Sequence, residues 1–337
     1  MPFLQYLHAV AERRNLGTAE ASEAMEAILA GEVSAPQIAA FLTALRMKGE
    51  TVDELVGFAR VMRSRAVRVD VGLNGETLLD TCGTGGDGQS TFNISTIAAF
   101  VAAGAGVRVA KHGNRSASSQ CGSADLLERL GIAVPLAPEA VARAIREIGI
   151  GFLFAPSVHT AMKHAQPVRV ELKMRTVFNL LGPLTNPAGA TAQLVGAPSE
   201  RTAELMAGAL AELGLERGFV VHGSDGLDEI TTTGTTLAFE IRGGRVERRT
   251  LSPEDFGVAR APGSALKGAD IETNAVIARA IFKGAAGPPR DIVLVNASAA
   301  LVSAGKAADF REAMEMARKS IDSGAAWKKV EDLARFR

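Results

Sequence analysis

Two patterns of apolar and polar residues divide the chain near residue 70. Residues 1–70 carry apolar side chains at spacings of three and four, the period of amphipathic helices. Two helix starts are marked by capping boxes, Ser34 with Gln37 and Thr51 with Glu54, in which each side chain can bond the other's backbone amide. No strand pattern interrupts this region, which is therefore predicted to be a small all-helical N-terminal domain.

From about residue 76 the pattern changes to short apolar runs, each followed by a Gly-rich turn and then a helical stretch. This alternation is typical of parallel β-α-β units. Residues 71–337 are therefore predicted to form a large α/β domain with a central, mostly parallel sheet. The expected strands lie in TLLDTC (77–82), VRVAKHG (107–113), IGFLFAP (150–156), AQLVGAP (192–198), GFVVHG (218–223) and DIVLVNA (291–297).

One segment breaks the rhythm. RTVFNLLGPLTNPA, residues 175–188, contains two prolines and fits neither a regular strand nor a long helix. We expect residues 165–188 to cross the cleft between the two domains and to pack on the helical one.

Composition narrows the possible partners. The 37 basic and 37 acidic residues cancel, so no net charge favours nucleic acid or an acidic membrane surface. A signal peptide needs an uninterrupted apolar stretch where this chain has the charged residues Glu12, Arg13 and Arg14. No later apolar run approaches the roughly 18 to 20 residues of a membrane span. Cys82 and Cys121 offer too few thiols for a disulfide framework or a zinc site. We expect a cytoplasmic globular enzyme with reduced cysteines.

The first chemical signal is the glycine-rich run Gly83–Gly88, between an expected strand and a helix that begins near Ser95. Glycines allow tight turns and close approach, and the amides at a helix start attract phosphate oxygens. A purely structural turn stays possible. The run also fits the G-x-G-x-x-G pattern of dinucleotide-binding enzymes, but the next strand ends in Lys111 and His112, where those enzymes place an acidic residue.

Two further loops follow neighbouring strands. Asn93–Thr96 supplies an amide and two hydroxyls at a helix start, for which capping alone is the ordinary explanation. Lys111–Ser119 adds two cations and three hydroxyls. Because ligands bind at the carboxyl edge of an open parallel sheet, both loops are predicted to face one ligand rich in phosphate.

A third loop, Asp225–Glu229, is acidic and follows the strand GFVVHG. Such loops are usually only solvated. Adjacent carboxylates beside a phosphate site also suit Mg²⁺, which binds through oxygen ligands and water, and we favour this metal.

Taken together, the motifs GTGGD, NIST, KHGNRSASS, GSADLLERLG, RTVFNLLGPLTNP and DGLDE resemble, in order, those of the anthranilate phosphoribosyltransferase family. The resemblance implies a small helical domain hinged to a large α/β domain, and a homodimer formed through the helical domain. It also implies Mg²⁺-dependent transfer of a phosphoribosyl group from phosphoribosyl pyrophosphate to anthranilate, in tryptophan biosynthesis.

The resemblance also implies roles for particular residues. Lys111, Asp228 and Glu229 are the expected catalytic residues, and Ser95, Asp228 and Glu229 the expected magnesium ligands. Gly83, His112, Asn114 and Arg169 are expected to hold anthranilate. Phosphoribosyl pyrophosphate is expected to contact Gly83, Gly86, Asp87, Thr91, Asn93, Ser95, Thr96, Lys111, Ser119 and Ser123.

One departure and several alternatives remain. Val170 stands where the family usually has a second arginine, which leaves Arg169 as the single anchor for the anthranilate carboxylate. His112 could be a general base or only orient the substrate. The pyrimidine nucleoside phosphorylases share the architecture and a GTGGD-like loop, although their second loop resembles Lys-Met-Ser. The absence of Asp228 and Glu229 would favour a binding protein without catalytic activity, but both acids are present.

Overall fold

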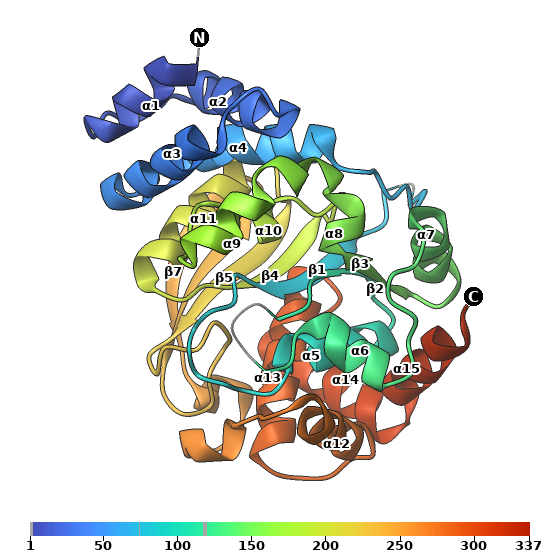
Figure 1. Ribbon diagram of the computed structural model, residues 1–337. Helices are drawn as coiled ribbons and strands as arrows, with labels where there is room; N and C mark the ends of the chain where they lie inside the picture. Colours follow the sequence, from blue (N-terminus) through green and yellow to red (C-terminus); the bar gives the residue numbers. More distant parts are fainter. Residues whose placement is uncertain (1–2, 74, 117–119) are drawn as a thin grey trace.

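The computed structural model describes residues 3–73, 75–116 and 120–337. Its N-terminal part consists of α1 (Phe3–Ala11), α2 (Thr18–Ala30), α3 (Ala35–Lys48) and α4 (Val52–Arg65), drawn in blue at the top of Figure 1. The two marked helix starts are confirmed: α3 follows Ser34 and α4 follows Thr51. At α4 the Thr51 amide donates to the Glu54 carboxylate at 2.9 Å, and the Glu54 amide donates to the Thr51 hydroxyl at 3.4 Å.

A seven-stranded sheet in the order β3-β2-β1-β4-β5-β6-β7 forms the centre of the molecule. The first five strands are parallel, and β6 and β7 are antiparallel additions at one edge. This confirms the predicted small helical domain and large α/β domain with a mostly parallel sheet. The strands are β1 (Leu78–Gly83), β2 (Arg108–Gly113), β3 (Ile150–Phe154), β4 (Ala192–Gly196), β5 (Arg217–Gly223), β6 (Thr236–Arg242) and β7 (Arg245–Leu251).

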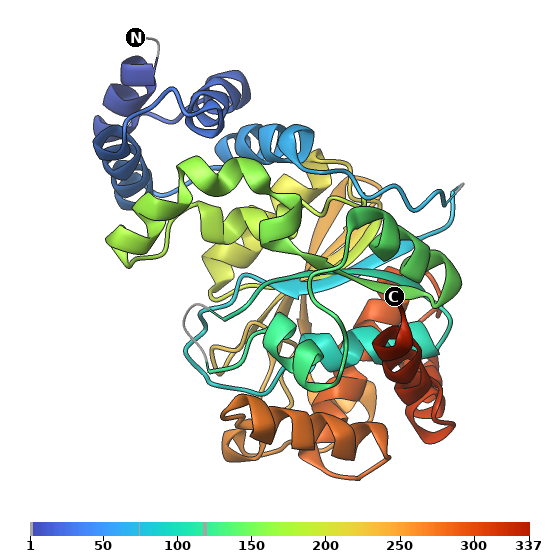
Figure 2. The same cartoon turned by 45° about the vertical axis from the view of Figure 1, so that its right-hand side comes forward.

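Helices cover both faces of the sheet (Figures 1 and 2). One face packs on α5 (Ile94–Gly104), α6 (Ser123–Arg129), α12 (Ile271–Phe282), α13 (Pro288–Ser303), α14 (Phe310–Asp322) and α15 (Ala325–Arg335). The other packs on α10 (Phe178–Leu184) and α11 (Glu200–Glu212), with α7 (Pro138–Glu147) over β2 and β3. Helices α1–α4 and α9 (Gln166–Leu172) form an outer layer that shares the core of α10 and α11. Short helices α8 (Ala155–Val158), η1 (Thr160–His164), η2 (Pro253–Phe256) and η3 (Gly263–Leu266) lie in the connections.

Strand β4 shows why a sheet covered on both faces has continuous apolar runs. Leu194 belongs to the core beneath α5 and α13, whereas its neighbour Val195 belongs to the core beneath α10 and α11. All five residues of the strand are buried, so it has no solvent-exposed face. Residues 165–184 share the second core with the helical domain, so this segment lies between that domain and the sheet.

The expected strand at DIVLVNA is wrong. These residues lie inside α13, where Ile292 to Leu301 are buried without a break. A helix that is apolar on every side has no 3.6-residue pattern, and a short window of it therefore reads like a buried strand. The glycine before it and the prolines Pro288 and Pro289 mark its start.

Candidate active site

The predicted site lies where the sheet reverses its winding. Strands β1 and β4 are neighbours, and the chain continues from β1 toward β2 and β3 but from β4 toward β5. Ligands of open α/β sheets bind outside the carboxyl ends of such strands. The acidic loop after β5 packs directly against both ends: a Cβ on Gly83 would lie 2.6 Å from the Asp228 carboxylate, and one on Gly196 would overlap the Asp228 backbone carbonyl. Glycine at these two positions therefore allows the acidic loop to reach the site.

Asp228 and Glu229 both bind backbone amides of the predicted phosphate loops. The Gly85 amide donates to the Asp228 carboxylate at 3.0 Å, and the Ser95 amide, in the first turn of α5, donates to the Glu229 carboxylate at 3.1 Å. The acidic and glycine-rich motifs, about 140 residues apart in sequence, thus meet in one place, as predicted. The carboxylates thus occupy two backbone N–H groups of the predicted phosphate loops.

Burial and mutual repulsion disfavour the charged forms of the carboxyl groups in this site. Burial, and then the neighbouring Asp87, raises the pKa of Asp228 to about 7, and burial with the Asp228 charge raises the pKa of Glu229 well above its ordinary value. Burial also raises the pKa of Asp80, at the centre of β1.

The cations near these carboxylates are Lys111 and Arg175. Lys111 lies within β2 rather than beyond its end, is 2% exposed, and donates from Nζ to the Thr81 carbonyl at 2.5 Å. Burial lowers its pKa, although Asp80 and Glu229 favour the charged form. If all four carboxyl groups named above (Asp80, Asp87, Asp228 and Glu229) were ionised, the charges of Lys111 and Arg175 would leave two negative charges unbalanced.

A bound divalent cation would offset this surplus and allow the carboxyl groups to ionise. Asp228, Glu229 and the hydroxyl of Ser95 can supply oxygen ligands beside the phosphate loop. Among the described residues, no three His, Cys, Asp or Glu side chains are grouped to hold a metal alone. Mg²⁺ commonly binds one or two carboxylates and completes its shell with water and substrate phosphates, so a site with few protein ligands fits it.

His112 and His159 form a neutral aromatic pair beside this charged centre. Their ring centres lie 5.1 Å apart, and burial lowers the pKa of His112 to about 4 and that of His159 to about 3. His112 Nδ1 lies 3.1 Å from the Gly182 carbonyl on α10. Its backbone amide donates to Asp80 at 3.0 Å, and Asp80 also accepts from Asn186 at 2.7 Å. These bonds fix β2 to the segment that follows α10.

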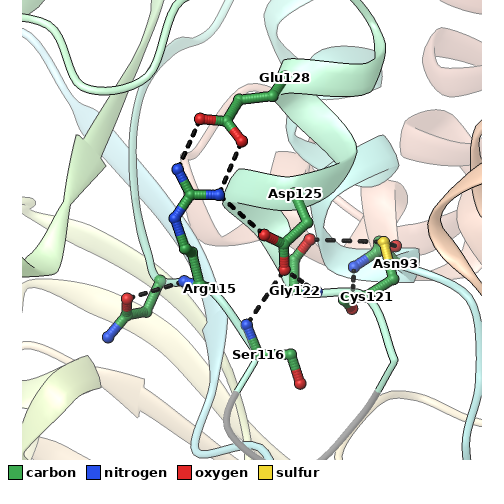
Figure 3. A network of polar contacts seen from close by, with 8 residues as sticks. Asn93, Arg115, Ser116, Cys121, Gly122, Asp125 and Glu128 are labelled. Atoms are coloured by element: carbon green, nitrogen blue, oxygen red, sulfur yellow. Dashed lines mark hydrogen bonds and ion pairs between the residues drawn. The ribbon is translucent and has the colours of Figure 1, made fainter.

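The described residues on both sides of 117–119, between β2 and α6, are joined by polar contacts (Figure 3). Arg115 bonds Glu128 through both terminal nitrogens, at 2.7 and 2.6 Å, and Asp125 at 3.0 Å. Asp125 also accepts the amides of Ser116 and Gly122, at 3.2 and 2.8 Å. Arg115 therefore has a structural role, and Lys111 is the cation of this motif that lies near the carboxylates of the predicted site.

The other predicted donor-binding residues surround the same edge. Asn93, the N-cap of α5, donates to the Cys121 carbonyl at 3.1 Å, so part of its hydrogen-bonding capacity is used internally (Figure 3). Thr91 forms an isolated bridge with Lys267, and Ser123 is the first residue of α6. Ser119 lies outside the described residues.

The two predicted anthranilate contacts beyond β2 differ in environment. Asn114 is exposed, and its carboxamide oxygen accepts the next residue's amide at 2.7 Å. Arg169, on α9, is half-buried, with its guanidinium 5.4 Å from the ring centre of Phe178 and 3.1 Å from Gln166. Burial lowers its pKa. Val170, by contrast, is 61% exposed, so the position of the missing arginine points away from the interior.

Unpartnered polar atoms are concentrated in the elements around this site. A buried donor or acceptor without a partner costs roughly 1 to 3 kcal/mol, so native proteins keep few of them. Eight buried side-chain atoms in the described chain lack a hydrogen-bond partner, and six belong to the elements described above: Asp87 Oδ2, Thr96 Oγ1, His112 Nε2, His159 Nε2, Arg175 Nη2 and Thr176 Oγ1. A polar ligand bound at this site would be able to satisfy atoms of this kind.

His159 supports the site from behind, since its ring packs on His112. Sequence reasoning missed one contributor. Arg175 received no role, although it opens the RTVFN motif and reaches the glycine-rich loop. The available signal was its position: a basic residue at the start of a segment predicted to cross a phosphate-binding cleft.

Comparisons with known proteins agree with the geometry. Residues 75–327 match the a/b domain of the glycosyl transferase family, and residues 4–66 match its helical bundle domain. The chain is 69% identical over 336 residues to the anthranilate phosphoribosyltransferase of Solibacter usitatus, covering 100% of this chain and 99% of that protein.

Solved structures give the same result. The crystal structure of anthranilate phosphoribosyltransferase from Thermus thermophilus matches with a TM-score of 0.92 at 47% identity, covering 98% of both chains. The Saccharomyces cerevisiae enzyme in complex with PRPP and Mg matches with a TM-score of 0.90 at 29% identity, covering 98% of this chain and 97% of that one. The resemblance inferred from six ordered motifs is thus confirmed, and the chain belongs to the anthranilate phosphoribosyltransferase family.

Proposed function

We propose that the chain transfers the phosphoribosyl group of phosphoribosyl pyrophosphate to the amine of anthranilate, giving N-(5-phosphoribosyl)anthranilate and pyrophosphate, as a step of tryptophan biosynthesis. The observation that carries this proposal is the convergence of the glycine-rich loop, the start of α5 and the two acids Asp228 and Glu229 at one point of the sheet.

The donor end of the site follows from these contacts. We assign the phosphates to the loop Gly83–Asp87 and the first turn of α5, where backbone N–H groups and the Thr96 hydroxyl are available. Lys111 places a buried positive charge behind this loop. As pyrophosphate leaves, negative charge grows on its oxygens, and fixed donors in a dry site stabilise that charge.

Asp228, Glu229 and Ser95 are the residues we propose to hold Mg²⁺, which when bound supplies Lewis-acid stabilisation of the leaving pyrophosphate. In the metal-free protein the same carboxyl groups, whenever they are ionised, would repel an incoming polyphosphate. Donor binding is therefore expected to depend on Mg²⁺.

The acceptor end lies beside the histidine pair. Anthranilate's aromatic amine is neutral at pH 7 and can attack without a strong base, so neutral His112, with a pKa of about 4, is assigned to orienting the substrate. Arg169 is assigned to the carboxylate, with Asn114 and Gly83 completing the pocket. An arginine fork matches the two oxygens of a carboxylate.

We further propose that residues 1–70 and 71–337 act as two hinged domains, with residues 165–188 packed on the smaller one. Closure would bring α9 toward the sheet edge and exclude water from the ribosyl donor. The shared core of α4, α10 and α11 supports this arrangement, since it ties residues 165–184 to the helical domain.

We propose a homodimer formed through the helical domain. A groove of about 540 Å³ runs between α1 and α3, lined largely by small apolar residues such as Ala40 and Ala44. Met47 beside it is 72% exposed, the most exposed large apolar side chain in the described chain. Light scattering should give the dimer mass, and Met47→Glu should shift it toward the monomer.

A cytoplasmic location is the remaining proposal. Both cysteines are free, as in proteins from reducing compartments. No helix in the described part of the chain is long and apolar enough to cross a membrane.

The activity can be tested directly. Purified protein mixed with anthranilate, phosphoribosyl pyrophosphate and Mg²⁺ should consume anthranilate, followed by loss of its fluorescence. EDTA should stop the reaction. No consumption, together with phosphorolysis of thymidine or uridine, would assign the chain to the nucleoside phosphorylase reaction instead.

A further inference from the structure

Arg175 is a cation aimed at the glycine-rich loop that none of the assignments above uses. Its Nη1 donates to the Gly85 carbonyl, and a Cβ on Gly86 would overlap the guanidinium. A Cβ at position 86 would therefore displace the guanidinium, and the positive φ of 73° independently favours glycine there. The guanidinium lies directly against the backbone of the loop.

The charge of Arg175 is not neutralised by an ion pair in the described chain. Burial lowers its pKa, while the carboxylates of Asp228 and Asp87 act at longer range in the opposite direction. Its second terminal nitrogen, Nη2, is buried without a partner. An unpaired guanidinium with a buried open donor is unfavourable unless an anion completes it.

The backbone of Arg175 is fixed from the helical domain. Arg46, in the last turn of α3, donates to the Arg175 carbonyl, so the arginine is anchored on one domain while its side chain contacts a loop of the other. The two N–H groups of its fork suit two oxygens of one phosphate.

We infer that Arg175 binds the pyrophosphate group of the donor. When phosphoribosyl pyrophosphate binds, the guanidinium exchanges its bond to the Gly85 carbonyl for bonds to phosphate oxygens. Binding of this substrate is thereby linked to the position of the helical domain. The pyrophosphate is favoured over the 5-phosphate because the guanidinium lies near Asp228, where we place Mg²⁺. This inference rests on the proposed function.

The test compares binding of three ligands by calorimetry, with Mg²⁺ and without anthranilate: phosphoribosyl pyrophosphate, pyrophosphate and ribose 5-phosphate. Arg175→Gln should weaken the binding of phosphoribosyl pyrophosphate and of pyrophosphate at least tenfold. The affinity for ribose 5-phosphate should stay within twofold of the wild-type value. Arg248→Gln on exposed β7 is the matched control and should change none of them. Arg175→Lys keeps the charge but not the fork, and should weaken pyrophosphate at least threefold.

Pyrophosphate binding within threefold of wild type in Arg175→Gln would overturn the inference, and so would equal loss of pyrophosphate and ribose 5-phosphate, which would indicate general damage to the loop. If Arg175→Gln does not fold, Arg175→Lys decides, and unchanged pyrophosphate affinity there has the same meaning. A wild-type protein that neither binds the donor nor consumes anthranilate would instead refute the proposed function.

Discussion

Replacing Asp228 with Asn should stabilise the metal-free protein, and the gain should grow with pH. The carboxyl has an ordinary pKa of 3.8 in the unfolded chain and about 7 in the folded one, because burial and Asp87 disfavour its charge. At pH above 7, keeping it ionised in the fold costs on the order of 4 kcal/mol. Asparagine has nearly the same shape and carries no charge, so the variant avoids this cost.

The sign follows from proton binding. Because the folded pKa is raised, folding takes up a proton between about pH 4 and pH 7, and the stability of the wild type falls as pH rises through that range. Between pH 5.5 and pH 8 the advantage of Asp228→Asn should increase by roughly 2 kcal/mol. For a chain of 337 residues, this corresponds to about 3 °C in melting temperature.

The assay is thermal unfolding in EDTA at pH 5.5 and pH 8, with Asp270→Asn as control. Asp270 is an exposed helix cap with a lowered pKa, so its variant should show no gain at pH 8. Adding Mg²⁺ and pyrophosphate should stabilise the wild type more than Asp228→Asn. An advantage of Asp228→Asn that does not change between the two pH values would refute the electrostatic reasoning.

Three further outcomes can be measured. Lys111→Met should lower kcat at least about 100-fold, the loss typical of removing one transition-state donor. The variant should still fold, because the straight apolar side chain of methionine fits the buried site. A kcat within tenfold of the wild-type value would contradict this. Arg169→Ala should raise the KM for anthranilate at least tenfold, consistent with a charge-assisted contact of about 1.5 to 3 kcal/mol, and keep donor affinity within about twofold; the reverse pattern would move Arg169 to the phosphate site. Because His112 has a pKa of about 4, the profile of kcat/KM against pH between 5.5 and 8 should have the same shape in His112→Asn as in wild type. A limb present in wild type and absent in the variant would show that His112 transfers a proton.

The sequence predicted the five parallel strands because each combines a buried run with a glycine-rich turn, two signals that agree. It failed at α13, where burial on all sides removes the helical period. It also missed β6 and β7, although the signal was present: Gly243 and Gly244, with φ of 55° and 77°, form the two-residue turn between paired Arg242 and Arg245.

Within the site, the sequence identified the motifs but not their mutual contacts. The approach of Asp228 to the amide of Gly85 depends on two glycines far apart in the chain, Gly83 and Gly196, which local patterns cannot relate. Strand β2 includes Lys111 and His112, as the run VRVAKHG predicted, but the burial of both side chains depends on packing that the sequence does not show. The raised pKa values likewise come from packing.

The antiparallel hairpin has a consequence for solubility. Strand β7 forms one edge of the sheet, and an open edge offers unpaired backbone groups to any other extended chain. Here that edge is lined with charge: Arg248 pairs with Glu200 at 3.5 Å, and Arg249 with Glu240 at 2.9 Å. A second molecule adding its own strand would have to desolvate these side chains. The arginines therefore protect the protein against edge-to-edge aggregation, and replacing them with β-branched apolar residues would create a template for it.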